Sequence, residues 1–333
     1  MDCICGHCRD RIFNPCFKIK DAGLFGNHSC ITVENMDKSV FIVVLNYKNL
    51  EDTIACLASL RKITYNKYRI VVVDNDSRDG SYEYLKEQET DCCIIQSGEN
   101  RGYAVGNNIG IRYALEQGAE YVCILNNDVE AEPDFLTKLV RYMESAPEVG
   151  MTGPVVYEFG ERDKIQSAGF SITVGRGSTE PLLQGKTKAA INREKTAECC
   201  DGLSGTCLLV KREVLEKAGL IPETYFLFFE EMEWCLTIRK NGYKLATVLT
   251  AAVYHKGSAT LKKTGTLSRY YMARNQALFV RRNGTALDLC TFLLTDGLGY
   301  AFRCLFSSRR ELRKMEFKAF LEGMRMDKNG SAI

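Results

Sequence analysis

Short apolar runs alternate with amphipathic segments through the first half of the chain. Four of these runs are expected to be buried strands because they are apolar but too short for a buried helix; they are residues 40–45, 69–73, 92–96 and 121–125. Helices are expected between them, at 50–63, from 81 onward and from 103 to 117. Strands and helices alternating at such short intervals predict an α/β fold with a mainly parallel sheet and right-handed crossovers.

Polar residues follow each of the four expected strands, at the point where the strand ends. They are Asn46-Tyr47, Asp74-Asn75, Asn100-Arg101 and Asn127-Asp128. In open α/β sheets, ligands bind just beyond the carboxyl ends of the strands. A carboxylate, an aromatic ring, an arginine and a metal carboxylate would together suit a nucleotide with its phosphates. The sequence therefore predicts a nucleotide site at this edge of the sheet.

Asp128 follows the strand expected at 121–125, which is apolar throughout, and Glu130 and Glu132 come close behind it. A carboxylate at such a strand end is suited to a hard divalent cation that also holds phosphate oxygens. The alternative is a turn or helix cap, because Pro133 and Asp134 open the next expected helix.

A dinucleotide-binding dehydrogenase is the main rival for this fold class. Its Gly-x-Gly-x-x-Gly fingerprint should follow the first strand, near residue 46. No glycine stands between 46 and 50, and the spacing of Gly102, Gly106 and Gly110 does not match. The sequence argues against that class.

In the second half of the chain, the regular alternation of apolar runs and amphipathic segments is lost. Residues 150–200 are expected to be mixed strand and loop, followed by a strand at 207–210 and a helix at 212–218. Three glutamates, Glu230, Glu231 and Glu233, then follow an aromatic run and precede a helix expected at 234–241. A helix N-terminus favours an ionised carboxylate, so these are candidate acid–base residues or simple first-turn caps. A strand at 247–254 delivers His255.

Composition excludes some classes of function. The 333 residues are 45% hydrophobic and 26% charged, with a formal charge of +2, which gives no basic footprint for nucleic acid. No charge-free apolar run reaches the roughly 18 residues of a membrane span, and the first residues show no apolar signal core. The fifteen cysteines are therefore expected to be reduced thiols in a cytoplasmic protein.

The two ends of the chain carry further candidates. Cys3, Cys5, Cys8 and Cys16 could hold a structural zinc ion, although their spacing is not that of a zinc ribbon; a flexible extension without metal is the alternative. Residues 287–306 are apolar and precede a basic segment. They could form an amphipathic element on the cytoplasmic membrane, or a helix pair packed against the catalytic domain.

Eight motifs, in order over residues 39–283, resemble family 2 glycosyltransferases, and most closely their rhamnosyltransferase-like branch. They are VVLNYKN, VVVDNDSRDGS, ENRGYAVGNNIGI, ILNNDVE, SGTCLLVKREVLEKAGL, FLFFEEMEWCLTIRKNGY, AVYHKGSAT and YYMARNQALFVRRN. The resemblance implies the GT-A fold with a C-terminal helical extension, and an inverting transfer of a sugar from a nucleoside diphosphate. It divides the chain into an N-terminal extension (1–37), a GT-A domain (38–260) and a C-terminal helical region (261–333).

The resemblance also implies roles for individual residues. Asp128 and His255 would bind Mg²⁺ or Mn²⁺, although the family's Asp-x-Asp pattern is here Asn126-Asn127-Asp128. Glu231, or else Glu230, would be the catalytic base. The residues implied in donor binding are Tyr47, Asp74, Asn75, Arg101, Tyr103, Asn127, Arg274 and Asn275. Those implied in acceptor binding are Gly205, Glu230 and Trp234.

The implied function is transfer of a rhamnose-like sugar to a saccharide or lipid-linked acceptor in cell-surface polysaccharide synthesis. The enzyme would be cytoplasmic or peripheral on the cytoplasmic face of the membrane. Two alternatives remain at this point: a protein that binds nucleotide sugars without turnover, and a zinc-binding module built on the N-terminal cysteines.

Overall fold

The computed structural model describes residues 38–326, apart from 193 and 258. Its first half contains β1 (Val40–Asn46), α1 (Leu50–Leu60), β2 (Tyr68–Asp74), α2 (Ser81–Gln88), β3 (Cys93–Gln96), α3 (Tyr103–Glu116), β4 (Tyr121–Asn126), β5 (Val129–Ala131) and α4 (Phe135–Ser145). The predicted strands and helices of this half are confirmed. Wherever the sequence predicted a first or last residue, the observed one lies within three residues of it. The alternation of apolar runs and amphipathic segments was thus a sufficient guide here.

The second half contains more strand than the sequence indicated. It comprises β6 (Val149–Glu158), β7 (Ile165–Ser167), β8 (Phe170–Thr173), β9 (Ser178–Pro181), β10 (Ala197–Cys200), β11 (Cys207–Lys211), α5 (Arg212–Ala218), α6 (Glu230–Lys240) and β12 (Lys244–His255). Helix α6 begins four residues before the predicted start at 234. Its first turn therefore holds Glu230, Glu231 and Glu233.

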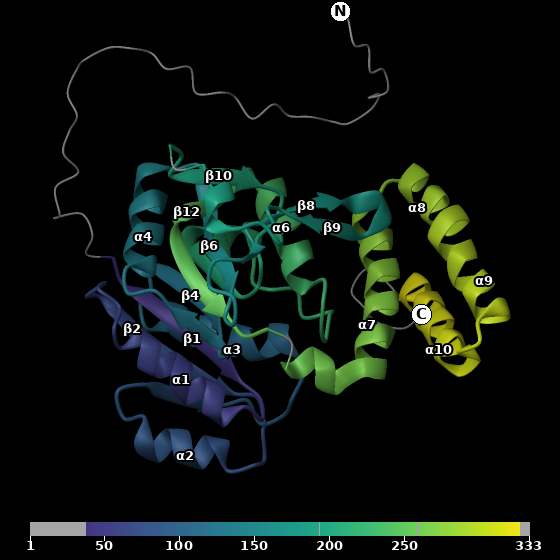
Figure 1. The fold of residues 1–333 in the computed structure, drawn as a ribbon. Coiled ribbons are helices and arrows are strands. Elements are labelled where there is room, and N and C mark those ends of the chain that lie inside the picture. Colours follow the sequence, from purple (N-terminus) through teal and green to yellow (C-terminus); the bar gives the residue numbers. More distant parts are fainter. Residues whose placement is uncertain (1–37, 193, 258, 327–333) are drawn as a thin grey trace, which may run out of the picture. The chain divides into compact units, whose positions relative to one another are not determined.

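One mixed sheet has the strand order β10-β12-β6-β11-β4-β1-β2-β3. Strands β4, β1, β2 and β3 are parallel, as predicted, whereas β11 runs antiparallel between β4 and β6. Strand β1 is buried on both faces because its alternate side chains enter two different cores. Val40, Ile42 and Val44 pack with α1 and α4, and Phe41 and Val43 pack with α3 and α6. Figure 1 shows these helices on the two faces of the sheet.

The C-terminal part is helical, as predicted: α7 (Ala259–Asn283), α8 (Ala286–Phe292), a π-helical turn (Leu293–Gly297), α9 (Leu298–Phe306) and α10 (Arg310–Arg325). Helix α10 packs directly on α7, as Figure 1 also shows, and Gly323 permits the contact. A Cβ at Gly323 would lie 2.0 Å from the carbonyl oxygen of Arg274. The helices share a core, built around Phe279, Phe292 and Phe320, with the segment that precedes α6.

The chain divides into two units, Met1–Glu34 and Asn35–Ile333. The first lies outside the described residues, and with it the predicted zinc ligands Cys3, Cys5, Cys8 and Cys16. The predicted boundary between 260 and 261 stays a prediction.

Candidate active site

The carboxyl ends of the parallel strands bring the predicted polar residues to one edge of the sheet. In register, Asn46 of β1 lies opposite Asp74 of β2, and Asp74 lies opposite Gln96 of β3. On the other side of β1, Leu45 lies opposite Asn126 of β4. The segments 46–47, 74–75 and 126–128 therefore meet at this edge, as the sequence predicted.

Asp74 and Asn75 are both buried, but they differ in whether their side-chain oxygens already accept hydrogen bonds. The Asp74 carboxylate accepts hydrogen bonds from Asn46 Nδ2 (2.7 Å), Ser77 Oγ (2.6 Å) and the Ser77 backbone N–H (3.0 Å), and it has no exposed surface. Asn75 donates from Nδ2 to Asn100 Oδ1 and the Gly102 carbonyl, while its Oδ1 is buried without a partner. A buried acceptor without a donor is costly. The Asp74 carboxylate is thus fully engaged within the protein, whereas Asn75 Oδ1 has an unused acceptor, and the contact of either residue with the donor stays a prediction.

Two other predicted donor-binding residues lie on the surface. The Tyr47 ring is 41% exposed directly after β1, with the Lys48 ammonium 5.3 Å from its centroid. Arg101 is exposed and forms a loose ion pair with Glu99, at 3.4 Å. A ring and a guanidinium that are both exposed at the strand ends are available to a base and a phosphate.

Asn127 is half-buried, and its side chain holds the loop that carries Asp128. Its Nδ2 donates to Thr53 Oγ1 (2.9 Å) and to the carbonyl of Asn49 (3.3 Å), both at the start of α1. We therefore assign Asn127 to positioning of this loop. Asp128 is left as the carboxylate that faces His255.

Asp128 and His255 meet because β5, which follows Asp128, pairs with the end of β12, with His255 opposite Val129. Asp128 Oδ1 and His255 Nε2 are 3.1 Å apart. Both side chains are about 15% exposed (15% and 14%), so they are accessible but partly desolvated.

The tautomer of His255 follows from a chain of hydrogen bonds that the sequence did not indicate. Gln166 of β7 donates from Nε2 to Glu158 Oε2 (3.3 Å), so its Oε1 faces His255 Nδ1 at 2.7 Å. An amide oxygen only accepts, so this hydrogen bond needs a proton on Nδ1. In the tautomer with no proton on Nε2, that nitrogen presents its lone pair to the Asp128 carboxylate. Two acceptors at this distance require a cation or a second ring proton between them, and a carboxylate with an imidazole fits Mn²⁺ or Mg²⁺ as partial ligands.

A strained turn places Glu230 and Glu231. Phe228 and Phe229 have φ values of 68° and 76°, in the left-handed region that bulky residues rarely adopt. Helix α6 begins directly after them. Such strain is typical of functional sites and persists only where neighbouring contacts hold it.

Asn275 of α7 makes the contacts that stabilise this strained turn. Its Nδ2 donates to the carbonyls of Leu227 (2.7 Å) and Phe228 (3.0 Å), and Arg274 Nε donates to its Oδ1. Asn275 has no exposed surface, so its predicted direct contact with the donor is corrected to a positioning role. The Arg274 guanidinium lies over the Tyr271 ring, 4.8 Å from its centroid.

Glu231 is half-buried, whereas Glu230 is 4% exposed and its Oε2 has no hydrogen-bond partner. Burial and the neighbouring Glu231 carboxylate raise the pKa of Glu230 well above its usual range. Burial raises the pKa of Glu231 as well. The deeper Glu230 is the one expected to keep its proton, and the more exposed Glu231 is the one that ionises and can act as a base.

Tyr103 and Gly205 lie beside these glutamates. The Tyr103 hydroxyl donates to the Gly205 carbonyl (2.8 Å), and a Cβ on Gly205 would lie 3.8 Å from Glu231 Cβ. Burial, followed by the charges of Glu231 and Glu230, raises the pKa of Tyr103 well above its usual range, so the hydroxyl stays protonated. Gly102, with φ at +94°, could not carry a side chain, because a Cβ would lie 2.1 Å from the Phe226 carbonyl oxygen.

Trp234 does not line the site. It has no exposed surface, and its indole N–H donates to the carbonyl of Gly219 at 2.9 Å. The predicted acceptor contact of Trp234 is therefore wrong: the side chain lies on the core face of α6, one turn after Glu230.

Loss of the Asn275 amide should loosen the turn before α6. In Asn275→Ala, two carbonyl oxygens lose their donor, and we expect the free energy of unfolding to fall by roughly 2–6 kcal/mol, at about 1–3 kcal/mol for each buried unsatisfied group. Urea unfolding measures this. The matched control is Asn241→Ala at the end of α6, where a half-buried amide makes one hydrogen bond to the Thr237 carbonyl, and it should lose about 1 kcal/mol or less. Equal losses in both variants would contradict the positioning role.

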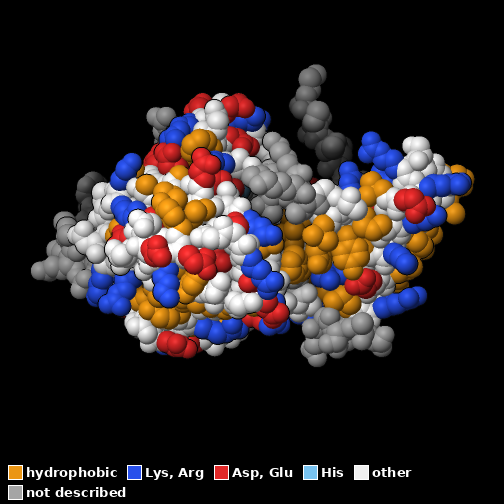
Figure 2. All heavy atoms as spheres, turned by 90° about the horizontal axis from the view of Figure 1, so that it is seen from below, with side chains coloured by type: hydrophobic (Ala, Val, Ile, Leu, Met, Phe, Trp, Pro, Cys, Tyr) orange, Lys and Arg blue, Asp and Glu red, His pale blue; other side chains and the backbone are white. Residues whose placement is uncertain are grey.

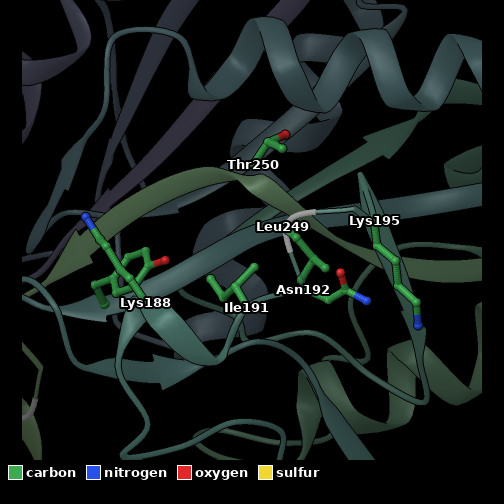
Figure 3. Close-up of a pocket in the computed structure, with 7 residues that line it drawn as sticks. Lys188, Ile191, Asn192, Lys195, Leu249 and Thr250 are labelled. Carbon is green, nitrogen blue, oxygen red and sulfur yellow. The ribbon is translucent and has the colours of Figure 1, made fainter.

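A separate cavity of about 310 Å³ lies against β12, with Tyr157, Leu249 and Thr250 in its lining. Lys188 and Lys195 stand at opposite ends of it (Figure 3). Both cations are already engaged, Lys188 with the Tyr254 hydroxyl (3.2 Å) and Lys195 with Glu198 (3.3 Å). Of the two cations, only Lys195 is thus paired with a carboxylate, and the cavity lies apart from the Asp128–His255 pair.

Comparison with known proteins agrees with this geometry. Residues 39–219 match the family model "Glycosyl transferase family 2". The chain is 27% identical over 301 residues to the dTDP-rhamnosyl transferase RfbF of Shigella flexneri, covering 87% of this chain and 97% of that protein. It is 25% identical over 221 residues to the N-acetylglucosaminyl-diphospho-decaprenol L-rhamnosyltransferase of Mycobacterium tuberculosis, covering 61% and 72%.

Solved structures share the fold at low identity. The mannosyltransferase PcManGT from Pyrobaculum calidifontis, in complex with GDP-Man and Mn²⁺, has a TM-score of 0.53 at 18% identity, with 86% of each chain covered. S. aureus TarS 1–349 in complex with UDP-GlcNAc has a TM-score of 0.56 at 13% identity, covering 86% and 81%. With its GT-A fold and its rhamnosyltransferase relatives, this chain belongs to glycosyl transferase family 2, in the rhamnosyltransferase-like branch, and is a glycosyltransferase.

Proposed function

We propose that the chain is an inverting glycosyltransferase that moves rhamnose, or a similar deoxyhexose, from a nucleoside diphosphate to a hydroxyl group of a saccharide or lipid-linked acceptor. The observation that carries the proposal is the Asp128–His255 pair, in which a carboxylate oxygen and an imidazole nitrogen lie 3.1 Å apart at the carboxyl end of β4. The two rhamnosyltransferase relatives support the choice of sugar, and the decaprenol-linked acceptor of one of them supports a lipid-linked acceptor.

In this proposal, Asn75 Oδ1 accepts an N–H of the base, the Tyr47 ring packs against the nucleoside, and Arg101 and Tyr103 lie along the diphosphate. Asp128 and His255 would hold Mg²⁺ or Mn²⁺. The cation would neutralise the charge that develops on the departing diphosphate. Gln166 keeps His255 Nε2 available as a ligand by fixing the proton on Nδ1.

The reaction needs a base because the acceptor hydroxyl is a weak nucleophile. Glu231 takes the hydroxyl proton while that oxygen attacks the anomeric carbon. The bond between the anomeric carbon and the diphosphate oxygen breaks, and its electron pair leaves with the nucleoside diphosphate. One displacement inverts the configuration at that carbon. Glu230, which stays protonated, would orient the acceptor.

We place the enzyme in the synthesis of a cell-surface polysaccharide, on the cytoplasmic side of the membrane. The relatives support this through the lipid-diphosphate acceptor that one of them names.

A thermal-shift screen of nucleoside-diphosphate sugars tests the donor assignment. A ligand that binds only the folded state stabilises it by about 2.7 kcal/mol at a hundredfold excess over its Kd. We expect a rise in Tm of several degrees with a dTDP-linked deoxyhexose and Mn²⁺, and a smaller one when the cation is chelated. Nucleoside monophosphates should give little shift. If no nucleoside-diphosphate sugar raised the Tm, with or without Mn²⁺, the proposal would fail.

A further inference from the structure

One helix of the C-terminal part exposes far more apolar surface than the rest of the described chain. Eleven large hydrophobic side chains are exposed in the described residues, and seven of them lie in Ala286–Phe306. Their exposed fractions run from 41% to 76%; they are Leu287, Leu293, Leu294, Leu298, Phe302, Leu305 and Phe306. Single exposed apolar residues are common, but a cluster of this size marks an interaction surface.

The spacing of these side chains places most of them in one stripe. Leu294, Leu298, Phe302 and Leu305 follow each other at intervals of four, four and three residues, which is one face of a helix. The opposite face is packed: Phe292 is fully buried, and the Tyr300 ring stacks on Phe320 of α10, with centroids 5.0 Å apart. The stripe is therefore the side of α8–α9 that no other described element covers (Figure 2 shows apolar side chains gathered over this part).

Cations flank the stripe. Arg303 lies on the same helix, over the Tyr300 ring at 4.6 Å, and Arg309, Arg310 and Lys318 follow at its end and along α10. All four are exposed, and none forms an ion pair within the described part of the chain. The glutamates of α10 nearby are paired: Glu316 is buried with Arg269 and Arg313, and Glu311 binds Lys314. On the helix itself, the Asp288 carboxylate accepts from Thr285 and the Asp296 carboxylate accepts from the Thr295 hydroxyl. An apolar stripe with free cations beside it matches a bilayer with anionic headgroups, where the acyl region takes the leucines and phenylalanines.

The packing of this helix favours a position along a membrane surface over one that crosses it. Among the described residues, Ala286–Phe306 is the one helix long and apolar enough to span a bilayer by length and composition. Its inner face, however, packs on α10, and Asp288 caps its first turn through Thr285. A spanning helix would have to leave those contacts and carry Asp288, Asp296 and Arg303 with it. A helix that lies flat on the membrane keeps its contacts with α10 and Thr285, and it buries only the exposed stripe.

We propose that the α8–α9 stripe, with the arginines that follow it, is a peripheral docking surface for an anionic membrane. Docking itself is independent of the transfer reaction; only its use, which is to bring the active site to a lipid-linked acceptor, rests on the proposed function. The partner is thus the lipid surface. The apolar side chains of the stripe would insert into it, and the arginines would bind its anionic headgroups.

Vesicle flotation of the full chain tests this. We expect the protein to float with vesicles that contain phosphatidylglycerol, to bind phosphatidylcholine vesicles far less, and to be released by high salt. Replacing the stripe by Leu298→Gln, Phe302→Gln and Leu305→Gln should abolish flotation. Arg309→Gln with Arg310→Gln should lower the partition coefficient roughly thirtyfold, at about fivefold for each cation near an anionic surface.

Matched controls separate docking from misfolding and from general charge. Tyr84→Gln removes an exposed ring on α2, and Lys62→Gln with Lys86→Gln removes the same charge elsewhere; both should float like the wild type. Every variant should keep its thermal shift with the nucleoside-diphosphate sugar. The proposal is overturned if the wild type does not float, if the stripe variant floats unchanged, or if sedimentation shows that a second copy of the chain covers the stripe and flotation does not depend on phosphatidylglycerol.

Discussion

Glu231→Gln is expected to lower kcat by about 10²–10⁴-fold, the usual cost of removing a general base. The amide keeps the size and the position of the side chain at the start of α6 but cannot take the acceptor proton. Donor affinity should change little, because the predicted nucleotide contacts lie at the ends of β1, β2 and β3. Initial rates at saturating donor, combined with calorimetric titration of the nucleoside diphosphate, measure both quantities.

The pH dependence of the wild type follows from the same residue. Burial raises the pKa of Glu231, so the base loses its charge at a higher pH than an ordinary carboxylate would. We expect kcat/KM to fall as the pH drops through this raised pKa, above about pH 4.5. The acid limb should be absent from the residual rate of Glu231→Gln.

Glu230→Gln is the neighbouring control. Glutamine resembles the protonated acid that Glu230 is expected to be, so kcat should fall less and the acceptor KM should rise. Because the pKa of Glu230 is raised in the folded state, ionisation of this group favours the unfolded chain as the pH rises. Glu230→Gln removes that penalty and should raise the Tm at neutral pH. A large loss of kcat in Glu230→Gln and a small one in Glu231→Gln would hand the role of base to Glu230.

Asp128→Asn is expected to lower the transfer rate by at least about 100-fold while the fold stays intact. Loss of residues that only support a metal ligand already costs about 10–100-fold, and Asp128 would itself be a ligand. Mn²⁺ should no longer raise the affinity for the nucleoside diphosphate, which calorimetry measures. His255→Ala should do less harm, because the carboxylate and Arg101 remain to hold the diphosphate.

Asp134→Asn is the matched control for this prediction. Asp134 follows the same strand by eight residues, but it is exposed and pairs with Lys138 at 2.7 Å. Its variant should behave like the wild type in rate and in cation dependence. Wild-type turnover in Asp128→Asn would show that Asp128 only shapes the turn after β4.

The sequence predicted the site best where each strand carries its own signal. An apolar run followed by a polar residue placed Asn46, Asp74 and Asp128 at one edge without any alignment. The direction in which those side chains point could not be predicted, because it depends on hydrogen bonds across the sheet. Asn127 is an example: it is adjacent to Asp128, yet it turns towards Thr53.

Gln166 is a residue of the candidate active site that could not be predicted from the sequence. Nothing in Ile165-Gln166-Ser167 distinguishes it from other short mixed segments. Its role arises only because β7 pairs with β6, and β6 pairs with β12, so that Glu158, Gln166 and His255 meet. Trp234 was wrongly expected to contact the acceptor for a related reason: the predicted helix began at 234, whereas α6 begins at Glu230 and turns the indole into the core.

The anomeric configuration of the product tests the central claim most directly. NMR of the disaccharide formed from the donor selected by the thermal-shift screen, with an aryl glycoside as acceptor, reports it without reference to any variant. We expect a configuration opposite to that of the donor, because the acceptor oxygen displaces the diphosphate in one step with Glu231 as base. A product with the donor's own configuration would contradict the single displacement, and with it the role given to Glu231.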